Sequence, residues 1–419
     1  MIDRRAFLRL AVQSTLAGAT ILSTPCWLLR TAEAATTDRT LICVFLRGGC
    51  DGLNMVVPHG DDEYHRQRPS IRIPSPGPGA VNAVLNLDGY FGLHPALNGL
   101  HALFRQGKLA ILPAVHYPDA TRSHFTSQAT IEQAGGPAGT GWLNRYLAAT
   151  GGSPGLRGLA FSPTAPDAMR GKIQVRAMNS LSGAVLSKDP AEEAQLVTAL
   201  QPQFEARPAG KESAALARVR EAGAMALADL EMLHGFGAAR YIASATYPQT
   251  LFGTRLRDAA MLIKNGLGLE VAAIDFGGWD THVAQGNGAP DGRQSRQLAE
   301  LDAGLMAFVA DLGTALSKVS VLVMTEFGRT LAQNANGGTD HGNASAWFVL
   351  GGTVRGGIHL GPRGWPGLLP DQLREARDLA HSVEFRQVMS NLLMRHLSLP
   401  AALVPSVLPG ATTTPLGFI

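Results

Sequence analysis

Several apolar runs that each stop abruptly at glycine or polar residues constrain the fold more than any other feature of this sequence. The first run, residues 40–46, is uninterrupted and ends in Arg47-Gly48-Gly49. An apolar run without polar alternation is typical of a strand that is buried on both faces of a parallel sheet. Four later segments have the same character: 109–115, 269–276, 319–325 and 346–350.

A helical pattern lies between two of these runs. Within residues 298–316, apolar side chains recur at intervals of three and four residues, which predicts an amphipathic helix. Strands that alternate with helices predict an α/β fold, with a mostly parallel central sheet and helices on both faces. Ligands of such sheets bind beyond the carboxyl ends of the strands, so chemistry is expected just after each apolar run.

The composition suits one large domain with an insertion. Of the 419 residues, 45% are hydrophobic and only 16% are charged, so the chain can bury a large core. We interpret residues 35–419 as the α/β domain. Within it, residues 151–250 begin rich in glycine and proline and continue into a helix-like run at 212–234, which predicts a mostly helical insertion or cap.

Residues 1–34 have the pattern of a targeting segment that is removed after export. The pair Arg4-Arg5, followed by an apolar residue and leucine, resembles a twin-arginine export signal, and an apolar stretch and Ala32-Glu33-Ala34 then offer a cleavage site. The alternative is a membrane anchor, which Pro25 and the polar residues of the stretch disfavour. The sequence therefore predicts export by the twin-arginine translocase to the periplasm or the outside, with no membrane span after cleavage.

Charge and cysteine spacing argue against nucleic-acid binding and against a disulfide bond. The targeting segment contains four arginines and two acidic residues, so 32 basic and 31 acidic residues remain after cleavage. No basic tract interleaves with aromatic residues, and nucleic acid is not an expected partner. An intervening strand would hold Cys43 and Cys50 roughly 20 Å apart, beyond disulfide reach, so both are expected to be free and buried.

Possible catalytic groups follow the first two apolar runs. Asp51 lies in a glycine-rich turn after the first run and is either a functional carboxylate or the cap of that turn. After the second run, Ser123 precedes a helical pattern, and its hydroxyl is either an ordinary N-cap or a nucleophile at the positive end of the helix. Arg122 beside it is a candidate ligand for a substrate phosphate or sulfate.

Carboxylates and imidazoles gather after the third and fourth runs. Asp280 and His282 follow the third run, Glu326 follows the fourth, and Asp340 and His341 come soon after it. Carboxylates brought together from separate strand ends repel one another unless a cation neutralises them, which indicates a metal site. The mixture of oxygen and imidazole ligands suits zinc, manganese or iron.

Together these motifs resemble the exported bacterial family called domain of unknown function 1501. The resemblance covers nearly the whole mature chain and rests on six motifs in order: Gly48-Gly49-Cys50-Asp51-Gly52-Leu53-Asn54, Arg122-Ser123-His124-Phe125, Gly141-Trp142-Leu143-Asn144-Arg145, Gly278-Trp279-Asp280-Thr281-His282, Glu326-Phe327-Gly328-Arg329 and Gly338-Thr339-Asp340-His341-Gly342. That family is grouped with alkaline phosphatases, sulfatases and cofactor-independent phosphoglycerate mutases, which share a metal-dependent fold. The resemblance therefore implies an alkaline-phosphatase-like fold.

The resemblance also implies roles for individual residues. Asp51 resembles the metal-binding aspartate after the first strand, and Ser123 resembles the nucleophile. Asp280, His282 and His341 resemble the ligands of one metal. Glu326 stands where the superfamily has an adjacent Asp-His pair, and the superfamily spaces its later aspartate and histidine further apart than this chain does. The number of bound ions is thus left open at one or two.

The leading interpretation is a metal-dependent hydrolase of phosphate or sulfate esters, with a small-molecule or polymer substrate. Ser123 would attack the ester, and Arg122 or Arg329 would bind its non-bridging oxygens. The alternative is a non-catalytic exported binding or assembly protein that keeps the fold. A third interpretation, polymer binding by the tryptophans at 142, 279, 347 and 365, competes with simple core packing of these rings.

Overall fold

The computed structural model describes residues 37–118, 120–152, 156–181, 186–187, 189–205, 212–235 and 241–419. The predicted export segment 1–34 lies outside these residues. The described chain divides into two compact units, which we call the main unit (37–179 and 243–419) and the helical unit (180–242). No helix in the described part of the chain is long and apolar enough to cross a membrane.

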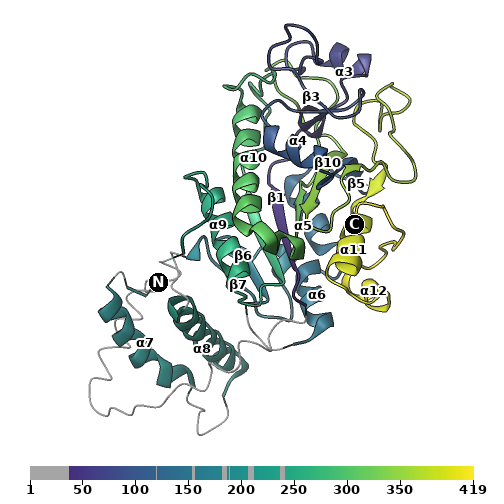
Figure 1. The fold of residues 1–419 in the computed structure, drawn as a ribbon. Coiled ribbons are helices and arrows are strands. Elements are labelled where there is room, and N and C mark those ends of the chain that lie inside the picture. Colours follow the sequence, from purple (N-terminus) through teal and green to yellow (C-terminus); the bar gives the residue numbers. More distant parts are fainter. Residues whose placement is uncertain are drawn as a thin grey trace. The chain divides into compact units, whose positions relative to one another are not determined.

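A central sheet of nine described strands forms the core of the main unit (Figure 1). Its order is β11-β5-β10-β9-β1-β8-β6-β7, and β12 pairs with β5. Among the described strands of this sheet only β10 runs antiparallel to its neighbours, which confirms the predicted α/β class with a mostly parallel sheet. The strands are β1 (Thr40–Leu46), β5 (Leu109–His116), β6 (Gly158–Phe161), β7 (Arg176–Ala177), β8 (Val271–Phe276), β9 (Val319–Met324), β10 (Ser345–Gly351), β11 (Gly357–Ile358) and β12 (Val383–Glu384).

Strand β1 lies inside the sheet, and every residue of it is buried. It pairs in parallel with β8 on one side and β9 on the other, with Phe45 opposite both Asp275 and Met324. The carboxyl ends of the three strands therefore lie side by side. Burial on both faces explains why this run shows no polar alternation in the sequence.

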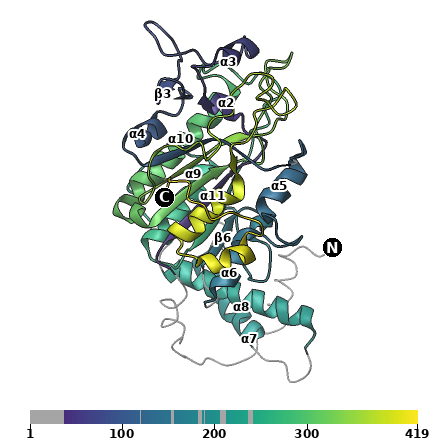
Figure 2. The same ribbon diagram turned by 90° about the vertical axis from the view of Figure 1, so that its right-hand side faces the viewer.

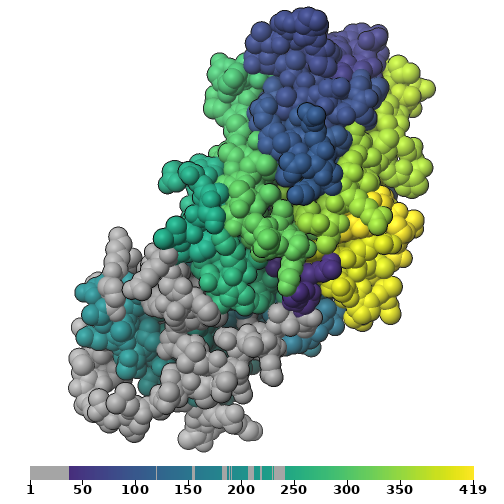
Figure 3. Space-filling view, viewed as in Figure 1, coloured from purple at the N-terminus to yellow at the C-terminus, as the bar shows by residue number. Residues whose placement is uncertain are grey.

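Helices cover both faces of this sheet, as the alternation of patterns predicts (Figures 1 and 2). Helices α4 (Asn98–Arg105), α9 (Leu251–Lys264) and α10 (Arg293–Leu312) pack together on one face, and the green α10 lies between the other two in the space-filling view (Figure 3). Helices α5 (His124–Gln133), α6 (Trp142–Thr150), α11 (Phe385–Asn391) and α12 (Val404–Val407) cover the other face.

Helix α10 follows the predicted amphipathic pattern but ends as an α-helix at Leu312. Gly313 has φ 52°, and the chain continues as the 3-10 helix η6 (Gly313–Lys318). A left-handed glycine is a common way for an α-helix to stop. The predicted helix 298–316 therefore spans two helical types.

Smaller elements complete the main unit. A three-stranded sheet of order β2-β4-β3 accompanies helices α2 and α3. The tryptophans at 142, 279 and 347 are fully buried, which supports core packing over an exposed stacking surface. The bounds are α2 (Gly52–Met55), β2 (Val56–Val57), α3 (Asp62–Gln67), β3 (Leu85–Asn86), β4 (Gly92–Leu93), η3 (Asp167–Met169), the π-helical turn η7 (Leu392–His396) and η8 (Ala401–Leu403).

The helical unit contains α7 (Pro190–Glu205) and α8 (Ala214–Gly235), which pack against each other. Helix α8 coincides with the helix-like run at 212–234. The first part of the segment predicted as an insertion, 151–250, instead supplies β6 and β7 to the central sheet. These two strands are short, and the surrounding glycines and prolines concealed them in the sequence.

His396 makes the stability of the main unit depend on pH. Its side chain is fully buried, and its Nε2 atom lies 2.8 Å from the carbonyl oxygen of Thr40. Burial lowers the pKa of His396 to about 4, whereas in an unfolded chain it is about 6.5. The unfolded state therefore binds a proton that the folded state does not between these pH values, and stability falls as pH falls.

We expect this histidine alone to remove roughly 2 kcal/mol from the free energy of unfolding between pH 7 and pH 5. His396→Gln keeps a side-chain N–H but does not titrate, so its stability should decline less over the same range. Urea unfolding of both proteins at each pH measures the difference. Parallel stability curves for the two proteins would show that His396 does not titrate in this way.

Candidate metal centre

Loops from several strands meet at one edge of the central sheet. The segments after β1, β5, β8 and β9 leave the sheet at this edge. Because β10 runs in the opposite direction, the residues that precede it arrive at the same edge. Backbone pairing between Arg329 and His341 joins the segment after β9 to the segment before β10. The edge predicted from the apolar runs is therefore where the polar motifs gather.

Two glycines allow these loops to approach closely. A Cβ atom on Gly48, which has φ 123°, would lie 2.6 Å from the backbone nitrogen of Asp280. A Cβ atom on Gly338 would lie 2.3 Å from the carbonyl carbon of His282. Only glycine avoids these overlaps, so the glycine motifs bring Asp280 and His282 into place.

Three imidazole rings surround the carboxylate of Asp280. The Nε2 atom of His282 lies 3.0 Å from Asp280 Oδ1, and the Nε2 atom of His341 lies 3.4 Å from the same oxygen. The Nε2 atom of His124 lies 3.6 Å from Asp280 Oδ2. The ligand atoms of His124, Asp280 and His341 all lie within 4.8 Å of one another, which is compatible with one shared ion. We call these four residues the histidine–aspartate cluster.

Each ring of the cluster is held by its other nitrogen. The Nδ1 contacts are His124 with Glu326 Oε1 at 2.8 Å, His282 with Asp340 Oδ1 at 3.0 Å, and His341 with the carbonyl oxygen of Arg122 at 2.8 Å. An ionised carboxylate and a carbonyl oxygen accept hydrogen bonds but cannot donate them. Each Nδ1 atom therefore carries the proton, and each Nε2 atom of a neutral ring presents a lone pair. Metal-binding histidines are commonly oriented in this way.

The Nε2 atoms that face one another indicate whether the cluster suits a cation. The Nε2 atoms of His282 and His341 are 3.0 Å apart, and burial lowers the pKa of His341, which favours its neutral ring. Two lone pairs at this distance repel unless a proton or a cation lies between them. The Nε2 atom of His124 is buried and has no hydrogen-bond partner among the described residues. The nitrogens of His124 and His341 and the carboxylate of Asp280, with His282 beside them, therefore suit zinc, manganese or iron.

Surrounding charges keep the carboxylates ionised. Burial raises the pKa of Asp280, but the Arg329 guanidinium, 2.6 Å from Oδ1, and the neighbouring imidazoles lower it below its usual range. Burial likewise opposes ionisation of Glu326, yet hydrogen bonds from His124 and Gln128 lower its pKa overall. The bond to Glu326 raises the pKa of His124, so binding of a metal would displace a proton from this ring.

The structure keeps three of the six predicted metal ligands in the cluster. Asp280, His282 and His341 lie together, while Glu326 and Asp340 contact the rings from outside. Asp51 is buried elsewhere: its oxygens accept from Arg68 at 2.5 and 3.0 Å and from Gln285 Nε2 at 2.6 Å. It also accepts from the backbone of Leu53 as the N-cap of α2, which agrees with the turn-cap alternative.

The predicted catalytic residues have other partners in the structure. Ser123 is exposed and forms the N-cap of α5, with its oxygen 3.5 Å from the backbone nitrogen of Thr126. Arg122 forms ion pairs with Glu375 at 2.5 Å and Asp378 at 2.7 Å. Arg329 is fully buried and donates to four carbonyl oxygens as well as to Asp280. Every guanidinium nitrogen of Arg329 thus has an acceptor, and Arg122 uses Nε and Nη2 for its carboxylate partners.

His124 is the cluster residue that the sequence analysis did not assign. It is the first residue of α5 and directly follows Ser123, in a segment that comes after a buried strand. The rule that identified His282, an imidazole just beyond a strand end, applies equally to His124. In the sequence the neighbouring hydroxyl of Ser123 is the more conspicuous candidate.

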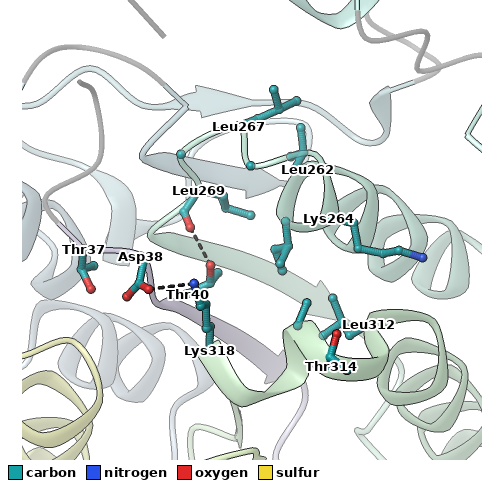
Figure 4. Close-up of a pocket in the computed structure, with 14 residues that line it drawn as sticks. Thr37, Asp38, Thr40, Leu262, Lys264, Leu267, Leu269, Leu312, Thr314 and Lys318 are labelled. Carbon is teal, nitrogen blue, oxygen red and sulfur yellow. Dashed lines mark hydrogen bonds and ion pairs between the residues drawn. The ribbon is translucent and has the colours of Figure 1, made fainter. Parts of the chain in front are cut away.

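A cavity of about 810 Å³ lies at the opposite edge of the sheet and does not contain the cluster (Figure 4). It adjoins Thr40, the first residue of β1, and the segments that enter β8 and β9. Its polar side chains are largely paired: Lys318 with Asp38 at 2.8 Å, Thr40 with the carbonyl oxygen of Leu269 at 2.7 Å, and Lys264 with Asp311 at 2.8 Å. These pairs supply no convergent set of open ligands.

Comparisons with known proteins identify the family of the chain. No curated protein matches the sequence. Among solved structures, the lipoteichoic acid synthase LtaP from Listeria monocytogenes is similar with 10% sequence identity and a TM-score of 0.34, over 84% of this chain and 73% of that protein. The model of a family described as "Protein of unknown function (DUF1501)" matches residues 110–394. Because this match covers more than half of the sequence, the chain belongs to the DUF1501 family.

Proposed function

We propose that this chain is an exported, metal-dependent hydrolase of phosphate or sulfate esters. The observation that carries the proposal is the histidine–aspartate cluster, in which three Nε2 atoms face one carboxylate while each Nδ1 atom is held by an outer acceptor. The side chain of Asp280 is 45% exposed, so a substrate can reach the cluster. An ion held here would act as a Lewis acid toward an ester oxygen.

The protein residues around the ion have separate tasks in this proposal. His124, Asp280, His282 and His341 hold the ion. Glu326 orients the ring of His124, and Asp340 orients the ring of His282. Arg329 neutralises part of the charge on Asp280 and keeps it ionised.

Ser123 remains the proposed nucleophile. It directly precedes His124, one of the proposed ligands. Its side chain is exposed, and it stands at the N-terminus of α5, where the helix dipole favours a developing alkoxide. Thr126 Oγ1, 3.3 Å away, donates to the Ser123 oxygen and leaves the serine proton free to be transferred.

A second function is favoured by the state of the two predicted anion-binding arginines. Arg122 and Arg329 are both committed to protein acceptors. A non-catalytic exported binding or assembly protein would need the fold and the ion but no anion-binding group. Stoichiometric metal without turnover of any ester would support this alternative.

The setting of the proposed activity follows from the N-terminal sequence. The Arg4-Arg5 pair and the apolar stretch after it support export by the twin-arginine translocase to the periplasm or the outside. That translocase would be a transient partner, and a small-molecule or polymer ester would be the substrate.

The mature protein loaded with zinc, manganese or iron is expected to hydrolyse an aryl phosphate, an aryl phosphodiester or an aryl sulfate. Asp280→Asn and Ser123→Ala should each lower kcat by roughly a thousandfold or more, because one weakens the metal centre and the other removes the nucleophile. Ser406→Ala, an exposed serine far along the chain, is the matched control. Full activity of Ser123→Ala would exclude the nucleophile, and inactivity of the metal-loaded wild type on all three esters would favour the binding alternative.

A further inference from the structure

We infer that a second cavity beside the histidine–aspartate cluster binds the ester substrate, with Arg377 holding its tetrahedral oxyanion and the cavity holding its alcohol. This inference rests on the proposed function and names the substrate-binding part of the same site. It assigns anion binding to a residue other than Arg122 and Arg329.

The cavity adjoins the cluster through one shared residue. It has a volume of about 240 Å³, and both Asp340 and Arg377 line it. Asp340 uses Oδ1 to hold His282 at 3.0 Å, so the wall of the cavity contacts a proposed metal ligand directly. An ester with its oxyanion at the cluster would therefore have its alcohol within reach of this cavity.

Arg377 has free hydrogen-bonding capacity at two of its three guanidinium nitrogens. Its Nη1 atom donates to the carbonyl oxygen of His341 at 3.2 Å and to Asp378 Oδ1 at 3.1 Å. Its Nε and Nη2 atoms contact no acceptor in the part of the chain that the structure describes, and the side chain is 39% exposed. A guanidinium fixed at one corner, with Nε and Nη2 open, suits a phosphate or sulfate.

Arg377 belongs to a group of three arginines around Asp378. Around Asp378, the guanidinium groups of Arg122, Arg374 and Arg377 share two carboxylates, and the charge of Arg377 also acts on a third, that of Asp340. The second carboxylate is that of Glu375, which pairs with Arg122 and Arg374. Of these guanidinium groups, that of Arg377 contacts the carbonyl oxygen of the proposed ligand His341.

The backbone that carries Arg377 is fixed in an uncommon conformation. Glu375 and Ala376 have φ 54° and 50°, a region that residues with side chains enter at a cost. The turn is closed by backbone bonds between Arg374 and Asp378 at 2.8 and 3.0 Å. These bonds hold the guanidinium in place without using its open N–H groups.

The lining of the cavity indicates the kind of alcohol it would accept. Leu368, Pro370 and Leu373 give it an apolar wall, while Gln67 and Glu63 offer polar atoms. A small alcohol with several hydroxyl groups and one apolar face, such as a glycerol or a single sugar ring, combines these properties. The volume is below the usual range of about 300 Å³ or more for sites of larger ligands, so a long alcohol would extend outside.

Isothermal titration of the zinc-loaded mature protein with inorganic phosphate and with inorganic sulfate tests the role of Arg377. Arg377→Gln should weaken binding of at least one of these anions by about tenfold or more, because a charge-assisted pair is lost. Arg377→Lys should bind these anions with an affinity between those of the wild type and Arg377→Gln, because the charge stays and the paired N–H donors of the guanidinium are lost. Arg170→Gln, which removes a surface arginine paired with Asp167, is the control and should bind as the wild type does.

The readouts separate failure of this inference from failure of the proposed function. Unchanged zinc content in Arg377→Gln together with anion affinity equal to that of the wild type would overturn the inference and leave the metal centre intact. Absence of zinc from the wild type would remove the proposed function itself. Zinc-loaded wild type that binds neither anion would also overturn the role of Arg377.

A second variant tests the cavity. Ala332 is exposed and lines it, so Ala332→Phe should fill the space with little effect on folding. Competition with glycerol 1-phosphate and glucose 1-phosphate should then weaken about tenfold, while inorganic phosphate binds within about twofold of the wild type. Equal binding of the sugar phosphate to both proteins would show that its alcohol does not occupy this cavity.

Discussion

The mature protein, purified without chelators and reconstituted with zinc, is expected to hold about one ion per chain, and His341→Ala is expected to weaken binding by more than about 100-fold. The reason is the convergence of three Nε2 atoms on Asp280, with His341 already turned inward by its Nδ1 bond to the carbonyl oxygen of Arg122. Elemental analysis and competition with a chromogenic chelator measure stoichiometry and affinity.

His101→Ala is the matched control for this measurement. His101 lies on α4, contacts the carbonyl oxygen of Asn86 at 3.0 Å and takes no part in the cluster. It should leave the zinc content unchanged. If the wild type retained no zinc, manganese or iron after reconstitution, the three rings would form a hydrogen-bonded network without an ion, and the hydrolase proposal would be wrong.

Asp51→Asn is expected to lower the free energy of unfolding by about 3 to 5 kcal/mol while zinc remains bound. Asp51 and Arg68 are both fully buried and form a two-bond pair, so loss of the carboxylate charge leaves the guanidinium uncompensated. Asparagine keeps the shape of the side chain and can still cap α2. Urea unfolding of the zinc-loaded proteins measures the change.

Asp61→Asn separates the buried charge from helix capping. Asp61 is the N-cap of α3, as Asp51 is of α2, but it is only half-buried and pairs with no guanidinium among the described residues. Asp61→Asn should lower the free energy of unfolding by no more than about 1 kcal/mol. An Asp51→Asn protein that lost its zinc as fully as His341→Ala, yet unfolded at the same urea concentration as the wild type, would restore Asp51 as a metal ligand.

The central sheet could be predicted because its strands are buried on both faces. Strands Thr40–Leu46 and Val319–Met324 are buried along their whole length, and the predominance of apolar residues that this burial requires is visible in the sequence. The direction of β10 was not visible, since an apolar run gives no sign of its orientation. The strands β6 and β7 escaped notice because four and two residues are too few to show a period.

The candidate site was predictable in its location and only partly in its membership. Asp280, His282 and His341 could be grouped from the sequence because each comes directly or soon after an apolar run. The partner of Asp51 could not, because Arg68 lies in an unpatterned segment and meets it only through tertiary folding. The same holds for Arg122, whose acceptors Glu375 and Asp378 are distant in the sequence.

The antiparallel course of β10 gives the site an unequal dependence on the rest of the chain. Backbone bonds extend the β9–β10 pairing through Gly328 and Asn343, so His341 and the outer acceptor Glu326 belong to one hairpin that closes over a short separation. His124 and Asp280 arrive from β5 and β8, much earlier in the sequence. An ion shared by all of them would join remote segments of the folded chain. Because the unfolded chain does not hold these ligands together, the bound ion would stabilise the folded state. Metal loss would then shorten the lifetime of the folded protein.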